Sequence, residues 1–185
     1  MLQSAIVSLC ERYRYQLTRC WNPTLPNLVF IMLNPSTADA SVDDATIRRC
    51  MGFSRDSGFG GIRVLNLYAF RATSPSDMRA AVDPVGPNNN RVILEALNKT
   101  QTGDMVICAW GANARNDRRA GEVLELIAKA GHVPHTLKLL GGDVPGHPLY
   151  LAASRRPERW FPLAGPLSAP ECTEENDLSE RHSAS

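Results

Sequence analysis

The fold is decided by a run of apolar residues that ends in a polar turn, LVFIMLNPS at residues 28–36. The six apolar residues of this run do not alternate with polar ones, which is typical of a strand covered on both faces in a parallel sheet. Two further runs of this kind occupy residues 62–67 and 105–109, and a weaker one spans 136–140. Four such runs predict a central, mostly parallel, four-stranded sheet.

Helical patterns separate these runs, and each is bounded by capping or stopping residues. The expected helices span residues 43 or 44 to 55, 91–97 and 120–130. The segment Arg12–Trp21 alternates apolar and polar side chains, as a strand at a sheet edge does. Strands that alternate with helices predict a three-layer α/β/α sandwich, with an N-terminal edge strand or hairpin added to the sheet.

The composition is that of a soluble globular domain, because 43% of the 185 residues are apolar and 21% are charged. The formal net charge of +1 is unevenly distributed. Residues 1–162 carry 19 basic and 14 acidic side chains, whereas residues 163–185 carry five acidic side chains and one basic side chain. We therefore expect one α/β domain over residues 1–162, with a basic surplus that suits phosphate contacts, and a flexible acidic tail over 163–185.

The five cysteines are scattered without a C-x-x-C pair. This argues against a disulfide framework, a structural zinc site or an iron–sulfur cluster, and it favours a reducing compartment. His132, His135 and Cys108 do not amount to a recognisable metal site. The sequence shows no signal peptide and no apolar run long enough to span a bilayer. We expect a cytoplasmic protein with no metal, no cofactor and no membrane partner.

Sheets of this kind bind ligands at the carboxyl ends of their strands, so the residues after each run are the candidates for a site. Asn34-Pro35 follows the first run, Asn66 interrupts the second, Trp110-Gly111 follows the third and His147 lies in the loop after the fourth. An unpaired buried amide is costly, so Asn66 either pairs with backbone or faces a ligand such as a pyrimidine edge. Asn-Pro is also a common turn opener, and a single histidine in a loop is often structural.

In their order and spacing, the four segments resemble the uracil-DNA glycosylase superfamily. Its members show a strand ending in Asp-Pro or Asn-Pro, a strand with a base-recognising Asn, a strand ending in a Trp-Gly-like turn, and a His-Pro-Ser loop. The chain has IMLNP at 31–35, VLNL at 64–67, VICAWG at 106–111 and GHPL at 146–149. The resemblance covers residues 28–151. The wording NPSTAD at 34–39 is also similar to a bacterial and phage family of uncharacterised domains in or near this superfamily.

The resemblance implies the same fold and a DNA glycosylase, an enzyme that extrudes a nucleotide from DNA and breaks its base–sugar bond. It implies that Asn66 hydrogen-bonds the pyrimidine edge and that His147 stabilises negative charge on the departing base. Asn34 matches the residue that holds the attacking water. Because an amide cannot accept the proton of this water, catalysis is expected either to rely on base departure through an oxocarbenium-like state or to use a nearby carboxylate. The candidates are Asp39, Asp43 and Asp44.

The base pocket is expected to include Pro35 and Tyr68 beside Asn66. Ser36 stands where the uracil-specific members have a bulky Tyr that excludes a C5 substituent. The small side chain at this position implies tolerance of a modified pyrimidine.

The resemblance also places contacts with DNA. Leu151 matches the apolar wedge that replaces the flipped base in the stack, with Tyr150 as second choice. The alternative for both is packing against the core. Arginines that flank the site loops are expected to hold phosphates. These are Arg115, Arg118, Arg119, Arg155 and Arg156. The lysines lie outside the matched motifs, so a Schiff-base lyase step is not expected.

The expected function is a monofunctional DNA glycosylase that excises a uracil-like, mismatched or bulky C5-modified pyrimidine and leaves an abasic site. Excision of a hypermodified phage cytosine in antiviral defence is one form of this hypothesis. The expected partner is DNA with a flipped-out pyrimidine, and no obligate protein partner is evident. Two alternatives remain: a non-catalytic nucleic-acid or nucleotide-binding module of the same fold, and a hydrolase of free modified nucleosides or nucleotides.

Overall fold

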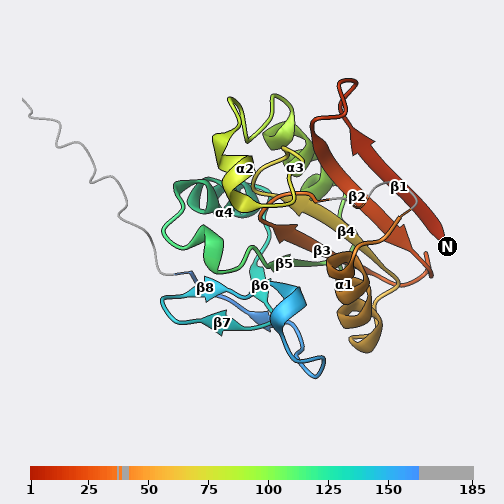
Figure 1. Cartoon of the computed structure of the whole chain (residues 1–185). Coiled ribbons are helices and arrows are strands. Elements are labelled where there is room, and N and C mark those ends of the chain that lie inside the picture. Colours follow the sequence, from red (N-terminus) through yellow and green to blue (C-terminus); the bar gives the residue numbers. More distant parts are fainter. Residues whose placement is uncertain (37, 39–41, 163–185) are drawn as a thin grey trace, which may run out of the picture.

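The computed structural model describes residues 1–36, 38 and 42–162 (Figure 1). Its main sheet has seven strands within these residues, in the order β1-β2-β4-β3-β5-β6-β9. These strands are β1 (Leu2–Val7), β2 (Arg14–Cys20), β4 (Gly61–Asn66), β3 (Asn27–Met32), β5 (Met105–Cys108), β6 (Pro134–Thr136) and β9 (Glu158–Arg159). A separate hairpin consists of β7 (Leu139–Leu140) and β8 (Val144–Pro145).

The four central strands, β4, β3, β5 and β6, are parallel to one another. β2 and β1 extend the sheet in antiparallel fashion on one side, and β9 does so on the other. The predicted mixed α/β fold with a mostly parallel central sheet is thus confirmed. The predicted N-terminal hairpin is formed by β1 and β2 at one edge of the sheet, and β9 adds a short strand that was not predicted at the other.

Helices cover both faces of the sheet (Figure 1). The α-helices are α1 (Ala45–Asp56), α2 (Pro75–Ala80), α3 (Asn89–Asn98) and α4 (Arg118–Lys129). Val29 and Ile31 of β3 belong to the core cluster that contains apolar residues of α3 and α4, whereas Leu28 and Phe30 belong to the cluster that contains those of α1. Both faces of β3 are therefore buried, which explains why the run at residues 28–33 shows no alternation.

The start of α1 lies close to the carboxyl ends of the central strands. Asp44 caps this helix by accepting a hydrogen bond from the backbone N–H of Ile47 at 2.8 Å. It is one of the two residues that the sequence predicts as the cap.

No helix in the described part of the chain is long and apolar enough to cross a membrane. The predicted acidic tail over residues 163–185 lies outside the described residues.

Candidate active site

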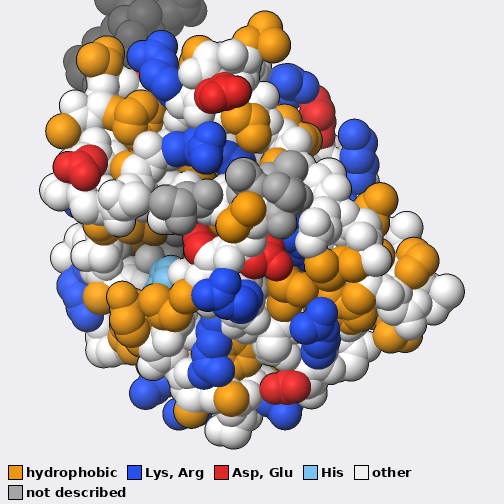
Figure 2. All heavy atoms as spheres, turned by 45° about the vertical axis from the view of Figure 1, so that its right-hand side comes forward, with side chains coloured by type: hydrophobic (Ala, Val, Ile, Leu, Met, Phe, Trp, Pro, Cys, Tyr) orange, Lys and Arg blue, Asp and Glu red, His pale blue; other side chains and the backbone are white. Residues whose placement is uncertain are grey.

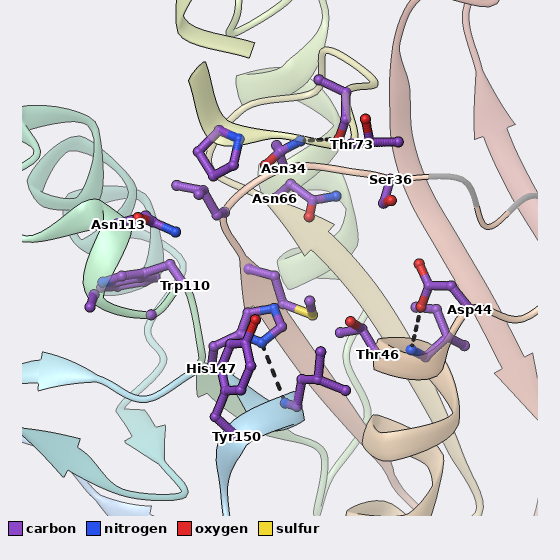
Figure 3. Close-up of a pocket in the computed structure, with 18 of the residues that line it drawn as sticks. Asn34, Ser36, Asp44, Thr46, Asn66, Thr73, Trp110, Asn113, His147 and Tyr150 are labelled. Atoms are coloured by element: carbon purple, nitrogen blue, oxygen red, sulfur yellow. Dashed lines mark hydrogen bonds between the residues drawn. The ribbon is translucent and has the colours of Figure 1, made fainter. Parts of the chain in front are cut away.

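A pocket of about 350 Å³ opens at the carboxyl ends of β3, β4 and β5 (Figure 3). Asn34 and Asn66 lie on one side of it, and His147 and Tyr150 lie on the opposite side. Trp110 and Asn113 form a third wall of the pocket. The fourth wall consists of Ser36, Asp44 and Thr46. The sequence prediction that Asn34, Ser36, Asn66 and His147 share one site agrees with this arrangement, because parallel strands end at the same edge.

Asn66 is the last residue of β4, and its side chain lines the pocket. The residue is only 1% exposed. Neither the amide nitrogen Nδ2 nor the amide oxygen Oδ1 has a hydrogen-bond partner among the described residues. Such a buried, unsatisfied amide is rare, because it loses its bonds to water without replacing them. A ligand that offers one donor and one acceptor would satisfy it.

The backbone at the end of β4 is held by α3 and α4. Asn89 donates from Nδ2 to the carbonyl oxygens of Asn66 at 3.1 Å and Leu67 at 2.9 Å. Arg119 donates from Nε to the Leu67 carbonyl oxygen at 2.8 Å and from a terminal nitrogen to Asn90 at 2.6 Å. The strand therefore ends in a fixed geometry, which limits the directions in which the Asn66 side chain can point. Sequence analysis missed this support, although three consecutive asparagines before a helical pattern could have indicated it.

His147 lies directly before the short 3₁₀ helix η2 (Pro148–Tyr150). The backbone N–H of Leu149 donates to its Nδ1 at 3.3 Å, which leaves the proton of the neutral ring on Nε2. Burial lowers the pKa of His147, while the nearby Asp44 carboxylate acts in the opposite direction. The histidine is therefore neutral at pH 7 and presents a hydrogen-bond donor rather than a cation.

Gly111 makes room for His147. It has a φ of +80°, and a Cβ atom at this position would lie 2.9 Å from the Cβ of His147. Gly131 offers a matched comparison, because its φ is +77° and a Cβ there would meet no atom within 4 Å.

We expect Gly111→Ala to displace His147 and Gly131→Ala to leave it in place. Both variants should lose about 1–2 kcal/mol of stability, because alanine disfavours the left-handed conformation. The NMR signals of the His147 ring and thermal denaturation measure the two effects separately. Equal changes of the ring signals in both variants would contradict the packing of Gly111 against His147.

Asn34 follows the carboxyl end of β3, and its Nδ2 donates to the carbonyl oxygens of Pro35 at 3.1 Å and Ala72 at 2.8 Å. Both amide hydrogens are thus in use, so the side chain can serve a ligand or a water only as an acceptor, through Oδ1. Ser36, two residues further on, lines the same pocket with a small side chain.

The three candidate carboxylates have different surroundings. Asp43 forms an ion pair with the fully buried Arg19, with Oδ1 and Nε 2.7 Å apart, and is not among the residues that line the pocket. Asp44 lines the pocket. Asp39 lies outside the described residues. Asp43 therefore serves the fold, and Asp44 is the described carboxylate of the three that lines the pocket.

Two residues predicted to form the base pocket, Pro35 and Tyr68, are absent from the described residues that line it. The Tyr68 hydroxyl instead donates to the Asp117 carboxylate, with its oxygen 2.8 and 2.9 Å from Oδ1 and Oδ2. Burial and this hydrogen bond raise the pKa of Tyr68 to about 12. Tyr68 therefore links the end of β4 to the start of α4 rather than facing a ligand.

The predicted wedge is also corrected. Leu151 is 7% exposed and belongs to the core cluster beside α1, and its carbonyl oxygen accepts a hydrogen bond from Arg49 of α1. Tyr150 is 81% exposed at the pocket, with its ring 5.6 Å from the ring of His147. Of these two neighbouring side chains, Leu151 packs in the core and Tyr150 is presented to solvent.

Of the arginines predicted to hold phosphates, Arg119 is 5% exposed and bonded at the end of β4, so it cannot contact a phosphate. The others have exposed or half-exposed side chains: Arg115, Arg118, Arg155 and Arg156. Arg118 pairs with Glu122 at 3.3 Å, and Arg115 donates to the Gly141 carbonyl oxygen at 2.5 Å. In Figure 2, a histidine side chain is visible in a hollow, and both basic and acidic side chains lie on the surrounding surface.

No group of three His, Cys, Asp or Glu side chains that could hold a metal ion occurs within the described ranges. His132 lies with Nε2 3.0 Å from the Leu97 carbonyl oxygen, and His135 lies with Nδ1 3.0 Å from that of Val133. Burial raises the pKa of the Cys108 thiol, so it is a poor source of a thiolate ligand.

Comparison with known proteins identifies a family. Residues 14–149 match a family described as a protein of unknown function, DUF1643. The matched region begins with β2 and ends within η2, so it includes all the pocket residues named above except Tyr150. No curated protein and no solved structure matches the chain. The match agrees with the similarity to a family of uncharacterised domains and does not extend to the uracil-DNA glycosylase superfamily.

Proposed function

Since the chain belongs to the DUF1643 family of proteins of unknown function, we propose from the chemistry of its pocket that it is a monofunctional DNA glycosylase. The enzyme takes a flipped-out pyrimidine into the pocket, hydrolyses its bond to the sugar and leaves an abasic site. The observation that carries the proposal is the unpaired amide of Asn66, which is 1% exposed and lines the pocket. The order of the four motifs along the sequence, which resembles that of the uracil-DNA glycosylase superfamily, supports it.

Base recognition is the role of Asn66. An amide side chain offers an acceptor and a donor side by side, and the edge of a pyrimidine offers the complementary pair. Because the amide is buried and already without a partner in the described part of the chain, binding a base satisfies it with no further loss of water. A base without the complementary groups would leave both ends of the amide unsatisfied, which gives strong discrimination.

Base departure is the role of His147. As the bond between the sugar C1′ and the base nitrogen breaks, the electron pair leaves with the base, and negative charge develops on the base oxygens. The neutral His147 ring donates from Nε2 to this charge. Preorganised donors of this kind are often the largest single contribution to catalysis.

Water attack completes the reaction. The Oδ1 of Asn34 accepts a hydrogen bond from water and orients it, because both Nδ2 hydrogens already bond to backbone. The water oxygen bonds to C1′, and its proton passes to the carboxylate of Asp44, which lines the same pocket. The predicted contribution of Asp39 stays a prediction, since this residue lies outside the described ranges.

Pocket size limits which bases can bind, and surface charge determines where the DNA backbone is held. A volume of about 350 Å³ and the small Ser36 side chain allow a pyrimidine with a bulky C5 substituent, including a hypermodified phage cytosine in antiviral defence. Tyr150 fills the gap that the flipped base leaves in the stack. Phosphate contacts come from the accessible arginines, which are Arg115, Arg118, Arg155 and Arg156.

The proposal is tested by incubating the protein with DNA that contains uracil, a mismatch or a modified pyrimidine, and by probing for abasic sites with alkali. We expect alkali-sensitive sites on at least one substrate, and no strand cleavage before alkali, because the lysines lie outside the pocket. DNA binding without abasic sites on any substrate would favour the binding module. Release of base only from free nucleosides would favour the nucleoside hydrolase.

Asp44→Asn should lower base release about 10²-fold or more, the usual contribution of a general base. Asparagine caps helices as well as aspartate does, so this variant should keep its stability. Asp43→Asn is the matched control. It should keep base release but lose about 1.5–3 kcal/mol of stability, because it weakens the hydrogen bond to the buried Arg19. Single-turnover rates and thermal denaturation distinguish the two, and a reversed pattern would make Asp43 the base.

A further inference from the structure

The outer edge of β1 is open. β1 pairs with β2 on one side, and in the described part of the chain no strand pairs with its other side. Five of its six residues are exposed, including Leu2 at 67% and Ile6 at 44%. Its sequence, LQSAIV, contains no charged residue. Backbone N–H and C=O groups along such an edge form a template for another strand.

The opposite edge of the sheet is protected in the usual ways. β9 has only two residues, Glu158 and Arg159, and both are charged and exposed. Short length and charge are devices that prevent pairing with another chain. β1 has neither device, although it belongs to the same sheet. This contrast indicates that the edge of β1 is a pairing surface.

The sequence of β1 is complementary to itself. The pairing with β2 shifts register between Ile6 and Val7, so the regular part of β1 runs from Leu2 to Ile6. If two copies of this segment pair antiparallel about its middle residue, Ser4 faces Ser4 of the second copy, and each Leu2 faces an Ile6. These exposed apolar side chains lie on the same face of the strand and would cover each other across the interface. No like charges meet.

We propose that two copies of the chain associate through antiparallel pairing of their β1 strands about Ser4, which joins the two sheets into one. A two-fold arrangement of this kind uses each edge once, so it closes as a dimer and does not propagate. No residue of β1 lines the described pocket, so both pockets stay accessible. The dimer is independent of the proposed function, and either can fail without the other.

The test is the mass of the full-length protein in solution, measured by light scattering or sedimentation over a range of concentrations. Wild type is expected to be a dimer. Leu2→Lys with Ile6→Lys places like charges opposite each other and should give a monomer. Leu2→Lys with Ile6→Glu places opposite charges across the same interface and should restore the dimer at low salt. A wild-type monomer at every concentration, or one mass for all three proteins, would overturn the proposal.

A cross-link tests the register. Directly opposed residues of antiparallel strands have Cα atoms about 4.5–5.5 Å apart, within the range of a disulfide. In a Cys10→Ser background, Ser4→Cys should therefore form a disulfide-linked dimer on oxidation. Gln3→Cys is the control, because Gln3 faces Ala5 of the second copy and not itself. Equal cross-linking of both variants, or none of Ser4→Cys in a dimeric protein, would contradict pairing about Ser4.

Discussion

Asn66→Leu is expected to make the protein more stable and much less active. The variant replaces a buried amide that has no hydrogen-bond partner among the described residues with an apolar side chain of the same branched shape. Removing an unsatisfied buried amide should stabilise the fold by about 1–3 kcal/mol. In a domain of this size each kcal/mol raises the Tm by about 2–4 °C. Base release should fall about 10²-fold or more, as when a preorganised hydrogen-bonding group is lost.

Asn89→Leu is the matched control, because it makes the same substitution at a second buried asparagine. Asn89 also has an amide oxygen without a partner among the described residues, but its Nδ2 holds the carbonyl oxygens of Asn66 and Leu67. Its loss should destabilise the protein by about 1–3 kcal/mol. Thermal denaturation measures the stability of both variants, and single-turnover assays measure their base release. A loss of stability in Asn66→Leu would mean that its amide serves the fold, and unchanged base release would remove it from base recognition.

His147→Leu is expected to lower base release about 10²–10³-fold, because it removes the Nε2 donor from the charge that develops on the base. A change in stability with pH should accompany this. Burial lowers the pKa of His147 in the folded protein, so between this lowered pKa and the ordinary value near 6.5 the unfolded chain binds more protons. Wild type should therefore lose stability as the pH falls below about 6.5, and His147→Leu should lose less.

His135→Leu is the control, because it removes a second histidine that lies outside the pocket. Burial also lowers the pKa of His135, which lies in β6 and does not line the pocket. This variant should likewise lose less stability on acidification, but it should keep base release. Denaturation curves from pH 5 to 8 and rates at pH 7 test both statements. If His147→Leu keeps its rate, the donor on the base lies elsewhere.

Sequence patterns could predict the centre of the fold and the main residues of the pocket, because both depend on strong periodic signals. Three buried apolar runs had to lie together, and parallel strands bring Asn34, Asn66 and the loop of His147 to one edge. The sheet edges gave weaker signals. β9 is only two residues long, and β1 is exposed on both faces, so neither shows the burial pattern of a strand.

The errors within the site concern neighbouring residues. The sequence favoured Leu151 over Tyr150, but a 3₁₀ turn separates their side chains and buries Leu151. It grouped Arg119 with Arg118, although adjacent helix positions point about 100° apart and only Arg119 faces the end of β4. Which of two adjacent residues faces a ligand depends on tertiary packing. The local sequence pattern does not reveal this packing.

The most direct test of the central claim is mass spectrometry of the small molecules that the wild-type protein releases from DNA containing a susceptible pyrimidine. The proposed reaction predicts the free base, in the same molar amount as the abasic sites in the DNA, and release about 10²-fold slower or more by the stable Asn66→Leu variant. Release of a nucleoside or nucleotide, or of nothing from any substrate, would contradict a glycosylase that reads its base through Asn66.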